Sequence, residues 1–218
     1  AYQEQEYRDI PLVRRAVQTA DLDAADFLAE EEEGWSVVLY DPILNGQRPL
    51  EPGCVMSILN PALQEYDGGG CSLTGLSFQE NAYHNAGLFA QVGVLPRAGE
   101  ALAGSLFVHD LILVEPSATA TGCAGAVIGR VEENGSFTGE NLRVENPKIT
   151  VTAPADGAAG GLAGSLAGGS LRGEIQVEGP EVSAEKGDAG GLAGRMKSVG
   201  LGEQQLAVTE PAVTVKNG

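Results

Sequence analysis

The five-residue motif Gly-Gly-Leu-Ala-Gly occurs twice in this chain, at residues 160–164 and 190–194. Residues 125–129 (GAVIG) and the looser 87–90 (GLFA) are related to it and precede it at similar intervals. A motif that recurs at such an interval is typical of repeat proteins, in which one structural unit stacks on the next. We expect the motif glycines to supply corners, where the backbone takes positive φ or approaches a neighbour closely. The expected repeat residues are Gly87, Leu88, Gly125, Gly129, Gly160, Gly161, Leu162, Gly164, Gly190, Gly191, Leu192 and Gly194.

A second block follows each copy of the motif and reads apolar, any residue, apolar, then a short polar gap that usually ends in proline. After the proline comes another alternating run, such as residues 148–152 (KITVT). Alternation with a period of two and many β-branched residues is typical of strands with one buried face, whereas helical repeats need apolar residues three and four positions apart. The blocks begin 31 to 35 residues apart, at Leu76, Leu111, Leu142, Ile175 and Leu206.

We expect the apolar residues of successive repeats to stack into columns. Coils stacked at the strand spacing of about 4.8 Å bury one another's apolar side chains and form a continuous core. The fold class is therefore predicted as all-β, a parallel β-helix (β-solenoid) of about five coils, right-handed because crossovers between parallel strands usually are. The first column holds the five residues that begin the blocks. The others are Phe78, Leu113, Val144, Val177 and Val208; Ala118, Ile149, Val182 and Val213; and Leu88, Val127, Leu162 and Leu192.

These repeated residues resemble the GLUG repeat of bacterial cell-surface proteins, in which a Gly-Gly-Leu-Ala-Gly motif precedes such strands. The likeness covers roughly residues 67–218, and residues 67–76 (DGGGCSLTGL) are similar to the segment that opens such arrays. At 87–90 the last glycine is replaced by Ala90. The GLUG repeat also occurs beside immunoglobulin A-cleaving zinc metallopeptidases. The resemblance implies a secreted or surface-exposed bacterial protein with an adhesin-like role.

Residues 1–34 do not follow the repeat, and their apolar residues have helical spacing. We predict a helical cap or connector here, with a second short helix that starts at Asp21 or Asp23, passes through 27–28 and ends in the acidic run and glycine at 30–34. Such a helix could cover the open first coil; contact with a preceding domain or another subunit is the alternative. The helical stripe consists of Leu12, Val13, Ala16, Val17 and Ala20.

Residues 35–218 are predicted to form the solenoid, as an irregular first coil over 35–66 and repeats over 67–218. Within the first coil, 36–42 and 54–59 are strand candidates. The longest gaps between repeat blocks, 79–86 and 91–104, are expected to project as loops on one side, where a binding surface would lie.

Composition limits the possible partners. The formal charge of −17 and the absence of a basic stripe make nucleic acid an improbable partner, because phosphate binding needs clustered cations. The sequence contains no apolar run of 18 residues, so it predicts no membrane-spanning helix. The chain opens at Ala1 without a signal-peptide pattern and stops at Gly218, so we expect it to be a processed or excised piece of a larger protein.

The sequence predicts no catalytic, cofactor or metal site. Both histidines, His84 and His109, lie outside any His-Glu-x-x-His motif, and no nucleophile motif accompanies the His109–Asp110 pair. The cysteines have no zinc-binding spacing; Cys54 and Cys71 could pair, but buried free thiols, including Cys123, are an equal expectation. A row formed by Glu115, Glu145 and Glu178 could bind calcium or act on a sugar, although a solvated edge is the more usual meaning.

We therefore expect a non-catalytic, extracellular structural or adhesive module of a bacterial surface protein. Its partners would be a host protein or glycan, adjacent domains of the same polypeptide, or neighbouring subunits. One alternative is a subunit of a surface filament, in which residues 9–28 cover a neighbour. The others are a polysaccharide-processing β-helix enzyme and an accessory region of a secreted metallopeptidase.

Overall fold

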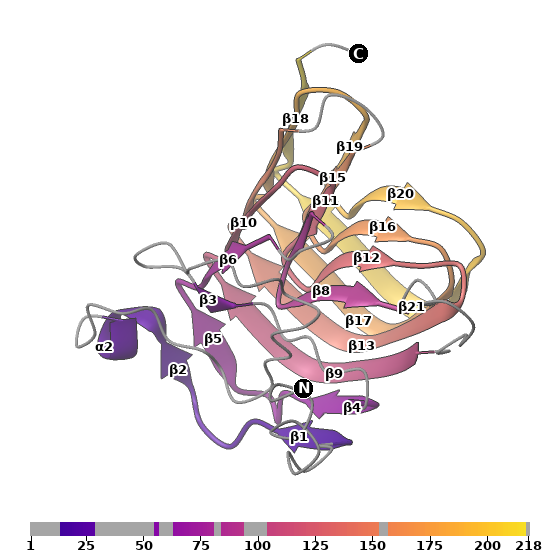
Figure 1. Ribbon diagram of the computed structural model, residues 1–218. Helices are drawn as coiled ribbons and strands as arrows, with labels where there is room; N and C mark the ends of the chain where they lie inside the picture. Colours follow the sequence, from indigo (N-terminus) through magenta and orange to yellow (C-terminus); the bar gives the residue numbers. More distant parts are fainter. Residues whose placement is uncertain are drawn as a thin grey trace, which may run out of the picture.

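The computed structural model describes residues 14–28, 55–56, 63–80, 84–93, 104–152 and 157–216. Within these ranges the strands pair in parallel and build four sheets, of eight, six, four and four strands. Each sheet takes strands from successive passes of the chain, so the polypeptide winds as a β-solenoid (Figure 1). The predicted all-β parallel solenoid is confirmed.

The regular part of the solenoid is shorter than the five coils expected. Four successive sets of strands contribute one strand to each sheet, so the winding from β7 to β19 makes about three turns. The sets are β7 (Asn85–Ala86), β8 (Phe89–Val92), β9 (Gly104–Val114) and β10 (Ser117–Ala120); β11 (Cys123–Gly125), β12 (Ile128–Val131), β13 (Gly135–Glu145) and β14 (Lys148–Val151); β15 (Ala158–Gly160), β16 (Ala163–Leu166), β17 (Gly169–Glu178) and β18 (Glu181–Ala184); β19 (Asp188–Gly190), β20 (Ala193–Met196), β21 (Val199–Thr209) and β22 (Ala212–Val215).

Earlier strands extend only two of the four sheets. They are β1 (Arg15–Val17), β2 (Leu22–Asp23), β3 (Val55–Met56), β4 (Glu65–Asp67), β5 (Ser72–Thr74) and β6 (Ser77–Gln79). The first sheet runs from β1 through β4 to β9, β13, β17 and β21, and a second ends at β6 and β3 (Figure 1). These short strands belong to the part of the chain that lacks the motif, which is why counting repeat blocks gave too many coils.

The apolar columns stack in register. Leu111 lies opposite Leu142, Leu142 opposite Ile175, and Ile175 opposite Leu206. Two residues further along each strand, Leu113, Val144, Val177 and Val208 are likewise in register, and the third column pairs Ala118, Ile149, Val182 and Val213. The Leu88, Val127, Leu162 and Leu192 column is joined by backbone hydrogen bonds between successive coils. The columns meet in one continuous core.

Leu76 and Phe78 do not belong to the columns we predicted for them. Phe78 lies opposite Ala118, and Leu76 precedes it, while Leu73 occupies the position opposite Leu113. The reason is a corner at Gly75, whose φ of 69° turns the chain between β5 and β6. The block at residue 76 is therefore the strand after the corner, and its missing proline is the signal that sets it apart.

Corners at the same place in later coils lie at the residue before a proline, and one of these residues is again a glycine, Gly179, with a φ of 57°. Glu115, Asn146 and Glu210 have φ values of 52°, 51° and 51°, and each precedes a proline. Glycine takes this left-handed conformation most easily and asparagine is enriched in it, whereas it is uncommon for glutamate. The repeated residue-plus-proline pair thus marks a left-handed corner between the long strand and the next one.

The glycines of the Gly-Gly-Leu-Ala-Gly motif permit close approach of neighbouring backbones. A Cβ placed on Gly160 would collide with the carbonyl oxygen of Ala163, and one on Gly164 with that of Gly129. Neither glycine has positive φ, so of the two roles expected for the motif, close packing is the one they serve.

The prediction of an N-terminal helical stripe is wrong for the residues of the stripe that the structure describes. Residues 15–17 form strand β1, which pairs in parallel with β4, so Ala16 and Val17 do not lie on a helix. The open edge of β4 offers unpaired backbone groups, and this tertiary pairing overrides the local periodicity. The helix α2 (Ala24–Leu28) has five residues and follows Asp23, whose Oδ1 accepts a 2.9 Å hydrogen bond from the Ala25 N–H.

Several predictions fall outside the described residues. They concern Leu12, Val13, the acidic run at 30–33, the strand at 36–42, Cys54, and most of the 91–104 loop. Of the strand predicted over 54–59, Val55–Met56 is described, as β3.

Truncating two leucines of one column should separate a buried position from an end position. Leu142 is 1% exposed and Leu206 is 42% exposed. We expect Leu142→Ala to lower the free energy of unfolding by about 3 kcal/mol and Leu206→Ala by about 1 kcal/mol, because only the first leaves a cavity between two coils. Urea denaturation of both variants measures the difference. Equal losses would contradict the stacking of these residues in one core.

Candidate functional site

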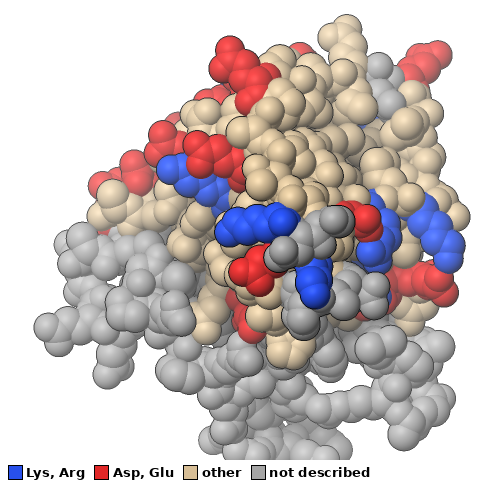
Figure 2. Space-filling view, turned by 90° about the horizontal axis from the view of Figure 1, so that it is seen from above, with Lys and Arg blue, Asp and Glu red and all other residues tan. Residues whose placement is uncertain are grey.

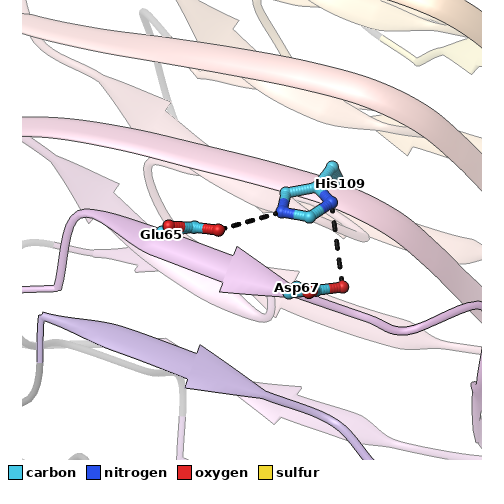
Figure 3. A group of neighbouring side chains, drawn as sticks. All are labelled: Glu65, Asp67 and His109. Atoms are coloured by element: carbon cyan, nitrogen blue, oxygen red, sulfur yellow. Dashed lines mark hydrogen bonds and ion pairs between the residues drawn. The ribbon is translucent and has the colours of Figure 1, made fainter.

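A charged cluster spans three neighbouring strands of the first sheet. Glu65 and Asp67 are two residues apart on β4, so their side chains lie on the same face of the sheet. The parallel register places Asp67 opposite His109 of β9 on one side, and Glu65 opposite Arg15 of β1 on the other. Figure 3 shows the His109 ring above the two β4 carboxylates. We call Arg15, Glu65, Asp67, His109 and Asp110 the ionic clasp.

The His109 ring is held from both nitrogens. Its Nδ1 lies 2.8 Å from Asp110 Oδ2 and 3.7 Å from Asp67 Oδ1, and its Nε2 lies 3.3 Å from Glu65 Oε1. The ring also stacks on Phe107, with ring centroids 4.5 Å apart, and the side chain is only 15% exposed. With a carboxylate at each nitrogen, the ring has partners for two donated protons, which only the imidazolium form carries.

Arg15 closes the clasp from the N-terminal side. Its Nε lies 3.0 Å from Glu65 Oε1 and its guanidinium Nη2 lies 3.1 Å from Asp67 Oδ2. The β4 carboxylates therefore lie between two cations. At the other end, Asn141 Nδ2 donates a 3.0 Å hydrogen bond to Asp110 Oδ1, so β13 also supports the cluster.

The clasp shifts the pKa values of His109 and Asp110 in opposite directions. Burial disfavours the charged His109 ring, but its hydrogen bonds to Asp110 and Glu65 and the nearby negative charges outweigh burial. The pKa of His109 is therefore raised above its ordinary value. The hydrogen bond with His109, followed by the one from Asn141, lowers the pKa of the Asp110 carboxyl. Together these shifts favour a charged pair near neutral pH.

Glu65, Asp67 and His109 are the residues that could hold a metal ion in the described part of the chain. One ligand atom from each lies within 4.8 Å of the others. A divalent cation would have to displace the proton from His109 and compete with the Arg15 guanidinium for both carboxylates. The arrangement fits an ionic connection between the N-terminal strands and the solenoid better than a metal centre.

The predicted glutamate row is not assembled as expected. Glu145 and Glu178 lie opposite each other on β13 and β17, but the residue opposite Glu145 on β9 is Val114. Glu115 instead forms the left-handed corner described above, so its place in the row was wrong. Arg143 bridges the two remaining carboxylates, with Nε 2.8 Å from Glu145 Oε1 and Nη2 3.3 Å from Glu178 Oε1.

The remaining chemical candidates lie apart from the clasp. The His84 side chain is half exposed, with Nδ1 3.5 Å from Glu80 Oε1. Cys71 and Cys123 are free thiols, and burial raises the pKa of Cys123; Cys54 lies outside the described residues.

Sequence reasoning singled out His109 and Asp110 but missed Arg15, Glu65 and Asp67. The available signal was the alternating Glu65-Tyr66-Asp67 segment, with two acidic residues flanking a buried aromatic one. The segment lies at the start of the predicted repeats and belongs to no repeat block, and Arg15 lies within the predicted helical segment, so nothing in the sequence aligned these residues with His109.

Comparison with known proteins gives a distant structural likeness. No family model matches the chain, and no curated protein matches it. A crystal structure of a Bacteroides ovatus protein proposed to be an immunoglobulin A1 protease is similar, with 15% sequence identity and a TM-score of 0.45. The match covers 91% of this chain and 60% of that one.

Among the residues that the structure describes, no helix is both long and apolar enough to span a bilayer.

Replacing His109 should change how stability depends on pH. Because the folded-state pKa of His109 is raised, its stabilising contribution is complete below the unfolded pKa of about 6.5 and is lost as pH rises through the folded pKa. We expect His109→Gln to remove this loss from the unfolding free energy measured in urea between about pH 5.5 and 9. NMR titration of the His109 ring gives the folded pKa directly.

The matched control is His84→Asn, at a half-exposed histidine whose φ of 65° asparagine tolerates. This variant should retain the pH dependence that His109 contributes. The account of the clasp would be wrong if wild type and His109→Gln lost stability in parallel, or if the His109 pKa lay below 6.5.

Proposed function

We propose that this chain is a non-catalytic structural and adhesive module of a bacterial surface protein, located outside the cell. The observation that carries the proposal is the in-register stacking of four parallel sheets around one continuous core. Each inner coil packs against two neighbours, so the coils cannot move independently and the body is stiff. Such a body suits a spacer that holds loops or a distal domain away from a surface. The resemblance to the GLUG repeat supports the bacterial and extracellular location.

The outward face of the longest sheet is suited to shallow binding. Thr138 and Ser170 are in register on β13 and β17, with their hydroxyl oxygens 3.4 Å apart. Further along the same strands, Arg143 is in register with Gln176. A row of hydroxyl, amide and guanidinium groups can bind a glycan or an extended peptide through hydrogen bonds. We propose a host glycan or protein as the ligand of this face.

The charged groups support a non-catalytic role. Glycoside-processing sites need carboxylates free to act as acid, base or nucleophile. In this chain Arg143 forms ion pairs with both Glu145 and Glu178, and Glu115 lies in a corner. His109 is likewise engaged by carboxylates at both ring nitrogens. These groups are arranged for stability rather than for chemistry.

The pairing of the N-terminal segment supports its role as a cap on its own molecule rather than as an arm that covers a neighbouring subunit. Strands β1 and β2 pair with β4 and β5 of the same chain. Between them the buried Gln18 side chain donates 2.9 Å hydrogen bonds to the carbonyl oxygens of Ala20 and Ser72. The described part of residues 9–28 is thus already used within the molecule.

Binding without turnover is the experimental expectation. The full chain is screened on an array of acidic and neutral glycans and against immunoglobulin A, and each bound ligand is assayed for cleavage. Ser170→Glu should weaken binding about tenfold, equivalent to about 1.4 kcal/mol, because it adds a charge to the outward face.

The matched control is Ser183→Glu, on β18 of a different sheet, whose hydroxyl also contacts a threonine of the neighbouring strand. It should bind as wild type does. Product formation that Glu145→Gln abolishes would overturn the non-catalytic proposal in favour of a polysaccharide-processing enzyme. Equal effects of the two serine variants would place the binding surface elsewhere.

A further inference from the structure

Two arginines flank a buried serine on the sheet that consists of β8, β12, β16 and β20. Arg130 of β12 lies opposite Ser165 of β16, and Ser165 lies opposite Arg195 of β20. Residues in register on neighbouring strands point to the same face of a sheet, and the strands are about 4.8 Å apart. The Ser165 hydroxyl therefore lies between two side chains that carry guanidinium groups. We call Arg130, Ser165 and Arg195 the arginine–serine row.

The Ser165 hydroxyl is buried and makes no hydrogen bond to another residue in the described part of the chain. Ser165 is 8% exposed. Elsewhere in the solenoid, the hydroxyl oxygens of Thr150 and Ser183 are in register on neighbouring strands and lie 3.2 Å apart, so these two groups satisfy each other. A buried hydroxyl costs free energy unless a hydrogen bond compensates for the loss of water. Ser165 therefore indicates a partner from outside the chain.

Each arginine of the row is held by a carboxylate and keeps donors for a ligand. Arg130 Nε lies 2.9 Å from Glu132 Oε1, and the Arg130 side chain is 44% exposed. Arg195 Nε and Nη2 lie 2.7 Å and 2.6 Å from Asp188 Oδ2. Among the described residues, both Nη atoms of Arg130 and Nη1 of Arg195 have no partner. The carboxylates thus orient the two guanidinium groups without using all of their N–H donors.

The neighbouring sheet places small residues beside the row. On it, Cys123 of β11 lies opposite Ala158 of β15, and Ala158 lies opposite Asp188 of β19, which binds Arg195. Burial raises the pKa of the Cys123 thiol, while the positive charges of Arg130 and Arg195 act to lower it. Both guanidinium groups are therefore close enough to act on one atom, in the part of the structure where the side chains of Ala158 and Ser165 are small.

The charges around the row favour a ligand with one negative charge. Figure 2 shows acidic side chains beside basic ones on the face that it presents. Glu132 and Asp188 accompany the two arginines, and the whole chain carries −17, so a ligand with several negative charges would be repelled. A sugar with one carboxylate brings a single charge. Its neutral hydroxyl groups can donate hydrogen bonds to the Glu132 and Asp188 carboxylates.

We propose that the arginine–serine row binds the carboxylate of an acidic sugar. The Ser165 hydroxyl donates a hydrogen bond to a carboxylate oxygen, and the Arg130 and Arg195 guanidinium groups donate from either side. Hydrogen bonds between guanidinium and carboxylate groups are among the stronger ones in proteins because both partners are charged. The row lies on a different sheet from the face of β13 and β17, so this site is independent of the glycan-binding face proposed above.

The test is an NMR titration of the full, ¹⁵N-labelled chain with glucuronate at constant ionic strength, with glucose as the neutral probe. We expect the Ser165 amide and Arg130 Nε–H signals to shift and saturate with glucuronate and to stay in place with glucose. Arg130→Gln and Ser165→Ala should each weaken glucuronate binding about tenfold, because each removes donors to the carboxylate. Acetate carries the same charged group without the sugar ring and should bind more weakly than glucuronate.

Lys148→Gln is the matched control, because it removes one positive charge from β14 of another sheet. It should bind glucuronate as wild type does, and all three variants should keep the wild-type circular dichroism spectrum. Titration without saturation, or equal weakening by Lys148→Gln and Arg130→Gln, would overturn the proposal and leave the arginines as ion pairs with Glu132 and Asp188. Sulfate or a glutamate-containing peptide that bound more tightly than glucuronate would overturn the assignment to an acidic sugar.

Discussion

Stacking of apolar side chains between hydrogen-bonded parallel strands is the interaction on which the whole structure depends. A single coil is too thin to bury its own core residues, so each coil relies on the next one. Leu142 is buried because Leu111 and Ile175 lie on either side of it, and Leu206 is exposed because, among the described residues, Ile175 is its one column neighbour. The same constraint explains the motif glycines, since a Cβ on Gly160 or Gly164 would keep neighbouring backbones from approaching.

The repeated part of the fold could be predicted from the sequence, whereas the remainder depended on contacts that no local pattern reveals. The columns that begin at Leu111 and Leu113 follow from alternation combined with a nearly constant period. Leu76 was misplaced because the corner at Gly75 lacks the proline that follows the corner residue in the later repeats. The helix expected near Ala16 failed because periodicity over a few residues is weaker than pairing with an open strand edge. The predicted number of coils was too high for a related reason, because the first strands of the chain extend only two of the four sheets.

The ionic clasp shows how the non-repetitive segment joins the solenoid. Strand β1 has few apolar contacts of its own, and Val17 is exposed. Its backbone pairs with β4, while Arg15, Glu65 and His109 connect three strands through charge. The His109–Asp110 pair of the clasp was visible in the sequence. The β4 carboxylates could be assigned to the clasp only from the register between β4 and β9, which links residues more than forty positions apart. The clasp and the Arg143 bridge both place carboxylates beside cations.

Interstrand nuclear Overhauser effects in deuterated protein test the central claim most directly. The account predicts amide-to-α-proton contacts typical of parallel strands between β13 and β17 and between β17 and β21, in the register that places Leu142, Ile175 and Leu206 in line. Close α-to-α-proton contacts typical of antiparallel hairpins between these strands, or a register in which these three residues are not aligned, would contradict it.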